Sequence, residues 1–249
     1  MSLSLTHLEP AATLRRAGLL IVTLLAALSM TARAQAQSTT FAARSHKIEV
    51  AVIGDSVAHD LGRGMEDLFD SNHRIHVVRQ TKFATGLVRT DYYNWNKVTR
   101  DFLRQNKPNV IVIVMGGNDN QTIRRNGKRY DPGTKAWRAE YARLVSRYMS
   151  NFRHSHAKVY WVSLPPVRSA KLTAAYRTIN AIGHYQAKRH GIHYVNVWKK
   201  FLTRSGAYSS FGESLEGVRR QIRKEDGEHF TDVGRRLFAS YVARDIGLH

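Results

Sequence analysis

Short apolar segments alternate along this chain with longer segments whose apolar residues recur every three or four positions. The short segments are Ile48–Ile53 and residues 73–80, 109–119, 158–166 and 192–198. The longer segments are approximately residues 58–70, 95–105, 134–153, 172–189 and 232–246. Short apolar runs bounded by glycine or proline predict buried strands, and the three-to-four spacing predicts amphipathic helices. Five strands alternating with helices predict an α/β fold, a three-layer α/β/α sandwich around a five-stranded parallel sheet.

The N-terminal 36 residues follow the order of a secretory signal. Arg15 and Arg16 precede the largely apolar, 14-residue run Ala17–Met30, and A-x-A cleavage sites end at Ala34 and at Ala36. The run is shorter than the roughly 20 apolar residues of a membrane span. We therefore expect an exported protein, periplasmic or secreted, rather than one held by an uncleaved anchor.

The rest of the chain shows no linker, repeat or change of composition that would divide it. We expect a signal peptide over residues 1–36, a flexible lead-in over residues 37–46 and one domain over residues 47–249. The sequence has no cysteine, which excludes disulfide bonds, thiol catalysis and cysteine-ligated metals. Stability must then come from an ordinary hydrophobic core, for which a chain of about 210 residues is long enough.

The chain is strongly basic, with 39 lysines and arginines against 19 acidic residues and a net charge of +20. Removing residues 1–36, which hold three arginines and one glutamate, leaves +18. Such an excess favours anionic neighbours. In an exported protein we expect membrane headgroups or acidic glycans rather than nucleic acid. A solvated basic surface explains the charge equally well.

Three polar clusters fall where the predicted strands end. They are Gly54-Asp55-Ser56, Gly116-Gly117-Asn118-Asp119 and the loop around Gly86. Ligand sites of open α/β sheets lie at the carboxyl ends of the strands. A serine between a strand and a helix lies beside unpaired backbone N–H groups, where it can attack a carbonyl carbon and have the oxyanion stabilised. Taken alone, Ser56 is better explained as a helix N-cap, and the rest of the chain has to decide between the two interpretations.

A serine nucleophile requires a base, and the base requires a group that orients it. Asp226 lies three residues before His229 in a glycine turn, so its carboxylate can fix the tautomer of the imidazole. His59 lies three residues after Ser56, but no carboxylate is placed to hold it, and we interpret it as a partly exposed helix residue. The Asn118 amide could donate to an oxyanion, although asparagine after Gly-Gly is also common in turns.

These segments resemble the SGNH (GDSL-like) hydrolase superfamily. The segments that carry the resemblance are GDSV, ATGLVR, GGND and DGEHFTDVG, which contain Ser56, Gly86, Asn118 and His229. The chain is most similar to a bacterial, exported branch of that superfamily that is described as a domain of unknown function. TGLVRTDYYNW, SLPPVR and the W-x-x-x-Y of the helix after GGND also resemble that branch. The similarity extends over about residues 46–245.

The resemblance implies a flavodoxin-like fold and an acyl-ester hydrolase that needs neither metal nor cofactor. Ser56 would be the nucleophile, His229 the base and Asp226 the group that holds it. The N–H groups of Ser56 and Gly86 and the side chain of Asn118 would form the oxyanion hole. The expected substrates are acyl esters, short-chain ones in particular, carried by an envelope polysaccharide or glycolipid.

Two other functions fit the same residues. An acyltransferase would use the same triad and pass the acyl group to a sugar instead of to water. A non-catalytic module would bind an anionic glycan through the loop Arg124–Arg129 and the segment Arg219–Lys224, which we otherwise interpret as solvated loops. Glu228 places a charge beside His229 and leaves the pH optimum open. The oligomeric state is equally open.

Overall fold

The central element is a sheet of five parallel strands in the order β2-β1-β3-β6-β7. A computed structural model describes residues 47–248, so the signal peptide and the lead-in expected over residues 1–46 lie outside the described residues. The strands are β1 (Ile48–Gly54), β2 (Ile75–Thr81), β3 (Val110–Val114), β6 (Lys158–Val162) and β7 (His193–Val195).

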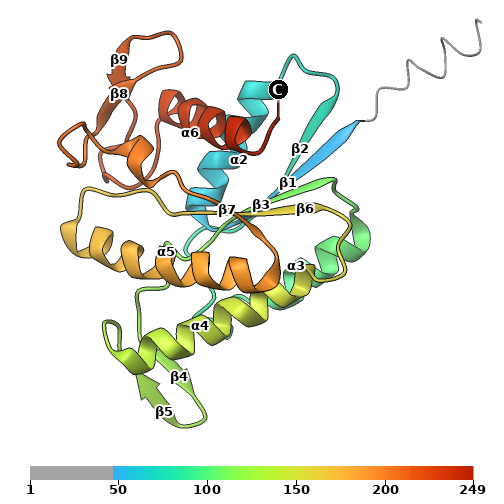
Figure 1. The fold of residues 1–249 in the computed structure, drawn as a ribbon, viewed down its shortest axis with the longest axis vertical. Helices are drawn as coiled ribbons and strands as arrows, with labels where there is room; N and C mark the ends of the chain where they lie inside the picture. The colour runs from blue at the N-terminus through green and yellow to red at the C-terminus, as the bar shows by residue number, and fades with distance from the viewer. Residues whose placement is uncertain (1–46, 249) are drawn as a thin grey trace, which may run out of the picture. The chain divides into compact units, whose positions relative to one another are not determined.

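Helices cover both faces of this sheet (Figure 1). Helices α2 and α6 pack together on one face, and α3, α4 and α5 lie on the other. The predicted three-layer sandwich with a five-stranded parallel sheet is confirmed. Within residues 47–248, no helix is long and apolar enough to cross a membrane. The helices are α2 (Ser56–Phe69), α3 (Trp95–Gln105), α4 (Lys135–Met149), α5 (Ala170–His190) and α6 (Asp232–Asp245), with 3-10 turns at Ser150–Phe152 and Trp198–Phe201.

The two most apolar segments of the sequence form the inner strands β1 and β3 of the sheet. Strand β1 pairs with both β2 and β3, and all five residues of β3 are buried. Strands buried on both faces have no solvated side and therefore show continuous apolar runs. The register sets Gly54 opposite both Thr81 and Val114. The carboxyl ends of β1, β2 and β3 therefore lie level, at one edge of the sheet.

Side-chain caps start the helices. Thr134, Ser169 and Thr231 each accept a hydrogen bond from a backbone N–H in the first turn of the following helix. Asp55 does the same for α2, which begins at Ser56 rather than near residue 58 as the sequence indicated. Helix α5 ends at His190 and is capped by Gly191, whose φ of 66° suits a C-terminal glycine.

Two short hairpins lie where the sequence indicated irregular loops. Strands β4 (Ile123–Arg125) and β5 (Lys128–Tyr130) flank Asn126-Gly127, whose φ angles of 49° and 72° suit a two-residue hairpin turn. Strands β8 (Phe211–Glu213) and β9 (Arg219–Gln221) pair within the segment after residue 201. Neither hairpin has an apolar alternation, because it is largely exposed, and periodicity therefore could not identify it.

Helices α2 and α6 lie in close contact at Gly64. A Cβ atom at Gly64 would lie 2.0 Å from the backbone oxygen of Arg235. A Cβ atom at Gly62, half a turn earlier, would lie 2.6 Å from the flexible side chain of Arg79 instead. Only the first contact is with backbone, which cannot move without shifting α6.

We expect Gly64→Ala to destabilise the protein although alanine favours helices by about 1 kcal/mol. Overpacking of this kind costs about 1–3 kcal/mol, which corresponds to a fall in Tm of roughly 2–4 °C for each kcal/mol in a domain of this size. Gly62→Ala is the matched control, and it should change Tm less because the Arg79 side chain can turn aside. Thermal unfolding followed by circular dichroism measures both. Equal Tm values for the two variants would contradict the close α2–α6 contact.

Candidate active site

Asp55 joins the turn after β1 to the loop after β3. Its Oδ1 accepts a hydrogen bond from the backbone N–H of Val57 at 3.0 Å. Its Oδ2 accepts from the N–H groups of Gly116 and Gly117, at 3.1 and 2.8 Å. Asp55 therefore brings the loop that carries Asn118 against the first turn of α2.

Removal from water is the largest influence on the pKa of the Asp55 carboxyl. Burial raises the pKa of Asp55 to about 7, and donation from the three backbone N–H groups opposes the rise. The same three bonds satisfy both oxygens without water. Asp55 therefore acts as a buried brace, whereas the neighbouring Ser56, the first residue of α2, is 7% exposed.

A second buried carboxylate, Asp119, holds the loop that contains Gly86. Its two oxygens accept from the N–H groups of Leu87 and Val88, each at 3.0 Å, and from the hydroxyl of Tyr141 at 2.9 Å. A Cβ atom at Gly86 would lie 2.1 Å from Oδ1 of Asp119. Glycine is required here because the backbone lies directly against the carboxylate. Burial raises the pKa of Asp119, against the effect of these donors.

Asn118 lies beside the Gly86 loop. Its Nδ2 donates to the backbone oxygen of Thr85 at 2.9 Å, and the Thr85 hydroxyl accepts from Nε1 of Trp95 at 3.1 Å. A side-chain amide nitrogen carries two hydrogens, so one remains for another acceptor. The structure thus brings two of the residues predicted for an oxyanion hole, Gly86 and Asn118, to adjacent positions.

Asp226 and His229 form the hydrogen-bonded pair predicted from their spacing. Nδ1 of His229 lies 2.8 Å from Oδ2 of Asp226, whose Oδ1 accepts from the N–H groups of Glu228 and His229 at 2.8 and 2.9 Å. Burial raises the pKa of Asp226, but these hydrogen bonds outweigh it and lower the pKa to about 2. The ionised carboxylate therefore holds the imidazole through Nδ1. Nε2 of His229 is buried and has no hydrogen-bond partner among the described residues.

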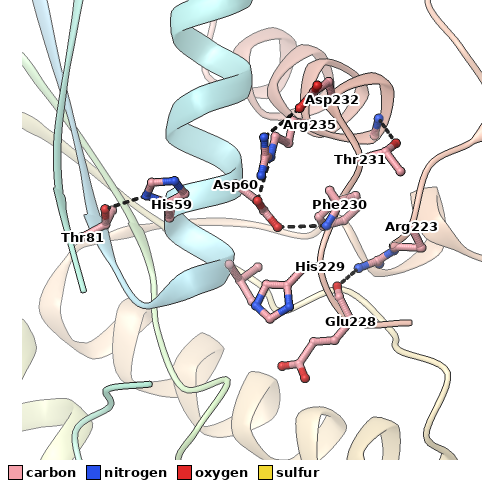
Figure 2. A network of polar contacts seen from close by, with 12 residues as sticks. His59, Asp60, Thr81, Arg223, Glu228, His229, Phe230, Thr231, Asp232 and Arg235 are labelled. Carbon is pink, nitrogen blue, oxygen red and sulfur yellow. Dashed lines mark hydrogen bonds and ion pairs between the residues drawn. The ribbon is translucent and has the colours of Figure 1, made fainter. Parts of the chain in front are cut away.

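His229 lies beside the N-terminal turn of α2 (Figure 2). The backbone N–H of Phe230, the next residue, donates to Oδ2 of Asp60 at 2.9 Å. Asp60 is one helical turn after Ser56. The segment that carries His229 and the first turns of α2 are therefore joined through the carboxylate of Asp60.

His59 does not belong to this group. Its Nδ1 lies 3.3 Å from the Thr81 hydroxyl and 3.1 Å from an Arg79 guanidinium nitrogen, and its ring packs against Phe83 at 4.7 Å. Partial burial lowers the pKa of His59, and the charge of Arg79 adds to the effect. Residues 47–248 contain no group of three or more His, Cys, Asp or Glu side chains placed to hold a metal ion.

Two side chains differ from the expectations based on sequence. Arg223, expected in a solvated basic segment, is fully buried and donates to the backbone oxygens of Glu228 and Pro166. Its guanidinium also lies over the ring of Phe230, 3.7 Å from the centroid. The segment Arg219–Lys224 therefore cannot offer this arginine to an anionic glycan. The carboxylate of Glu228 accepts from the Tyr176 hydroxyl at 2.7 Å, so its charge has a partner of its own.

Sequence reasoning missed the residues that hold the site together. Asp60 carried a signal, because it is a charged residue on the otherwise apolar face of α2 formed by Val57, Leu61 and Met65. A charge on such a face is rarely buried unless it is paired. Asp119 and Arg223 carried no signal of this kind, since both lie in polar segments of the sequence.

We expect Asp119→Ala to destabilise the protein by about 2–4 kcal/mol, because it leaves the buried N–H groups of Leu87 and Val88 without acceptors. Asp131→Ala is the matched control. It also removes a carboxylate bound to two side chains, Thr122 and Arg129, but an exposed one, and should therefore destabilise the protein much less. Urea unfolding measures the free energies of unfolding, and amide hydrogen exchange measures how well the N–H groups of the Gly86 loop are protected. Unchanged exchange at Leu87 and Val88 in Asp119→Ala would contradict the conclusion that Asp119 holds this loop.

The lowered pKa of Asp226 predicts a stability difference that depends on pH. Folding lowers this pKa, so the pair stabilises the fold above the unfolded carboxyl's pKa of about 3.9, and the stabilisation is lost as the pH falls towards about 2. The difference in unfolding free energy between wild type and Asp226→Asn should therefore shrink over this range. Asp67→Asn, at an exposed position of α2, should show a smaller change with pH. Urea unfolding between pH 2 and 6 measures both, and a constant Asp226→Asn difference would contradict the pairing.

The fold is that of several solved bacterial hydrolases. The lipase/acylhydrolase from Enterococcus faecalis matches with a TM-score of 0.55 and 15% identity, over 80% of this chain and 95% of that chain. A GDSL-like lipase from Bacteroides thetaiotaomicron matches with a TM-score of 0.54 and 16% identity, over 80% and 87%. The psychrotrophic esterase EstA from a Pseudoalteromonas species matches with a TM-score of 0.54 and 13% identity, over 80% and 96%.

Among curated proteins, none matches this sequence. A family model described as "Protein of unknown function (DUF459)" matches residues 49–245, nearly the whole of the described chain. The family model and the shared fold together confirm the resemblance to the SGNH hydrolases and to a branch of unknown function. The chain belongs to the DUF459 family.

Proposed function

We propose that the protein is a serine esterase or deacylase that hydrolyses acyl esters through Ser56, His229 and Asp226. The observation that carries the proposal is the state of His229. Its Nδ1 is held by an ionised carboxylate, and its buried Nε2 has no partner beside the helix that begins at Ser56. An imidazole with one nitrogen held and the other free is arranged to accept a proton.

The first step is attack by the serine. Nε2 of His229 takes the proton of the Ser56 hydroxyl as Oγ bonds to the carbonyl carbon of the ester. Asp226 stabilises the imidazolium that forms. Catalytic hydrogen bonds that are long in a free enzyme shorten when substrate binds. His229 then returns the proton to the leaving alcohol, and water releases the acyl group from Ser56 by the same route.

Three donors support the oxyanion of the tetrahedral intermediate. They are the N–H groups of Ser56 and Gly86 and the second hydrogen of the Asn118 amide. Asp55, Asp119 and the Thr85 carbonyl accept hydrogen bonds from neighbouring donors, which supports the assignment of the remaining three to the oxyanion. Each such donor contributes about 3 kcal/mol of transition-state stabilisation.

The likeness to lipases, acylhydrolases and esterases supports ester substrates for this chain. The order of charges and apolar residues over positions 1–36 supports export, to the periplasm or beyond the cell. The net positive charge favours an anionic carrier. We therefore include in the proposal that the ester is borne by a glycan or glycolipid of the cell envelope.

A fluorophosphonate probe applied to the full-length protein tests the proposal, because it reacts with activated serines. We expect labelling of wild type, and loss of labelling in Ser56→Ala and in His229→Ala. His59→Ala is the matched control for the base and should keep its labelling. Absence of labelling, together with no turnover of p-nitrophenyl acetate between pH 6 and 9, would reject the enzyme. That result would favour the non-catalytic binding module.

A further inference from the structure

Asp60 connects the helix that begins at Ser56 to the segment that carries His229. Its side chain is 3% exposed and lies one turn after Ser56 on the buried face of α2. Oδ2 accepts a hydrogen bond from the backbone N–H of Phe230 at 2.9 Å, and Oδ1 accepts one from Nε of Arg235 at 2.8 Å. Figure 2 shows the carboxylate between these two donors. Both donors lie at least 170 residues later in the sequence.

The charge of Asp60 is balanced inside the protein. Arg235 is 16% exposed, and its Nη1 also donates to Oδ1 of Asp232 at 2.7 Å, in the first turn of α6. A carboxylate removed from water is costly unless donors satisfy its oxygens. Both oxygens of Asp60 have donors in fixed directions, so the orientation of the carboxylate is fixed as well.

Other contacts hold the His229 segment from a different side. The buried guanidinium of Arg223 donates to the backbone oxygens of Glu228 and Pro166. Through these bonds Arg223 connects the turn that contains Glu228 to Pro166, in the loop after β6. The bond from Asp60 differs, because it connects the segment to the helix of the nucleophile.

We propose that Asp60 is a positioning residue, which sets the distance between Nε2 of His229 and Oγ of Ser56 by binding the N–H that follows His229. The inference rests on the proposed esterase function. Misplacing reacting groups by about 1 Å reduces a rate by roughly 100-fold. Asp60 touches neither the substrate nor the reacting atoms, so its loss slows the chemistry and leaves substrate binding intact.

D60N isolates this contact. An amide has one acceptor oxygen, so D60N cannot accept from both Phe230 and Arg235, and its NH2 group must face one of these donors. R235Q sets a carbonyl oxygen near the position of the Arg235 Nε. The double variant D60N/R235Q therefore restores two complementary bonds, with the new amide donating to the glutamine oxygen and accepting from Phe230. R235Q alone and D232A are matched controls, because both keep the Asp60–Phe230 bond.

The measurements are kcat and KM for p-nitrophenyl acetate, the rate of fluorophosphonate labelling, and Tm, all on the full-length protein. We expect D60N to lower kcat and the labelling rate by about 10–100-fold, with KM within about twofold of wild type. R235Q and D232A should stay within about threefold of wild type in kcat. D60N/R235Q should recover the kcat of R235Q. A purely structural role for Asp60 would lower Tm without this separation of kcat from KM.

Two results would overturn the inference: a kcat for D60N equal to that of wild type, or a kcat for D60N/R235Q as low as that of D60N. Should D60N not fold, the inference is tested by comparing D60N/R235Q with R235Q: equal kcat values support it, and a much lower kcat for the double variant overturns it. Failure of the proposed function gives a different pattern, an inactive wild type or a Ser56→Ala protein that labels like wild type.

Discussion

Carboxylates that accept hydrogen bonds from backbone N–H groups, three of them buried and one exposed, are the interaction on which this site depends. Asp55 binds the N–H groups of the loop after β3, and Asp119 binds those of the Gly86 loop. Asp60 binds the N–H that follows His229, and Asp226 binds those of the turn before it. In each case a side chain satisfies main-chain donors that an irregular loop would otherwise present to water. Loops far apart in the sequence are thereby fixed at one edge of the sheet.

This arrangement has an energetic consequence. Removing a carboxylate from water disfavours its charge, and burial raises the pKa of Asp55 to about 7. The turn of Asp226 shows the opposite balance, because hydrogen bonds lower the pKa of this more exposed group to about 2. Burial thus disfavours the charged form of Asp55, whereas hydrogen bonds favour the charged form of Asp226 beside His229. The two kinds of carboxylate serve different purposes in one site.

The sequence predicted the layers, the order of strands and helices, and the pairing of Asp226 with His229, because these depend on local periodicity and spacing. It did not predict the β4–β5 and β8–β9 hairpins, which bury too little to need an apolar pattern. It also missed the role of Asp60 and the burial of Arg223. Asp60 binds Phe230, and Arg223 binds Pro166. Both partners are distant in the sequence, so these contacts cannot be predicted from neighbouring residues.

We propose that Ser56, Gly86, Asn118 and His229 form one site around a single reacting carbonyl group. A crystal structure of the protein after reaction with a fluorophosphonate tests it most directly. We expect phosphorus bonded to Oγ of Ser56, with the phosphonyl oxygen within hydrogen-bond distance of the Gly86 N–H and the Asn118 amide, and with Nε2 of His229 facing the adduct. Phosphorus on another residue, or a phosphonyl oxygen directed away from Gly86 and Asn118, would contradict it.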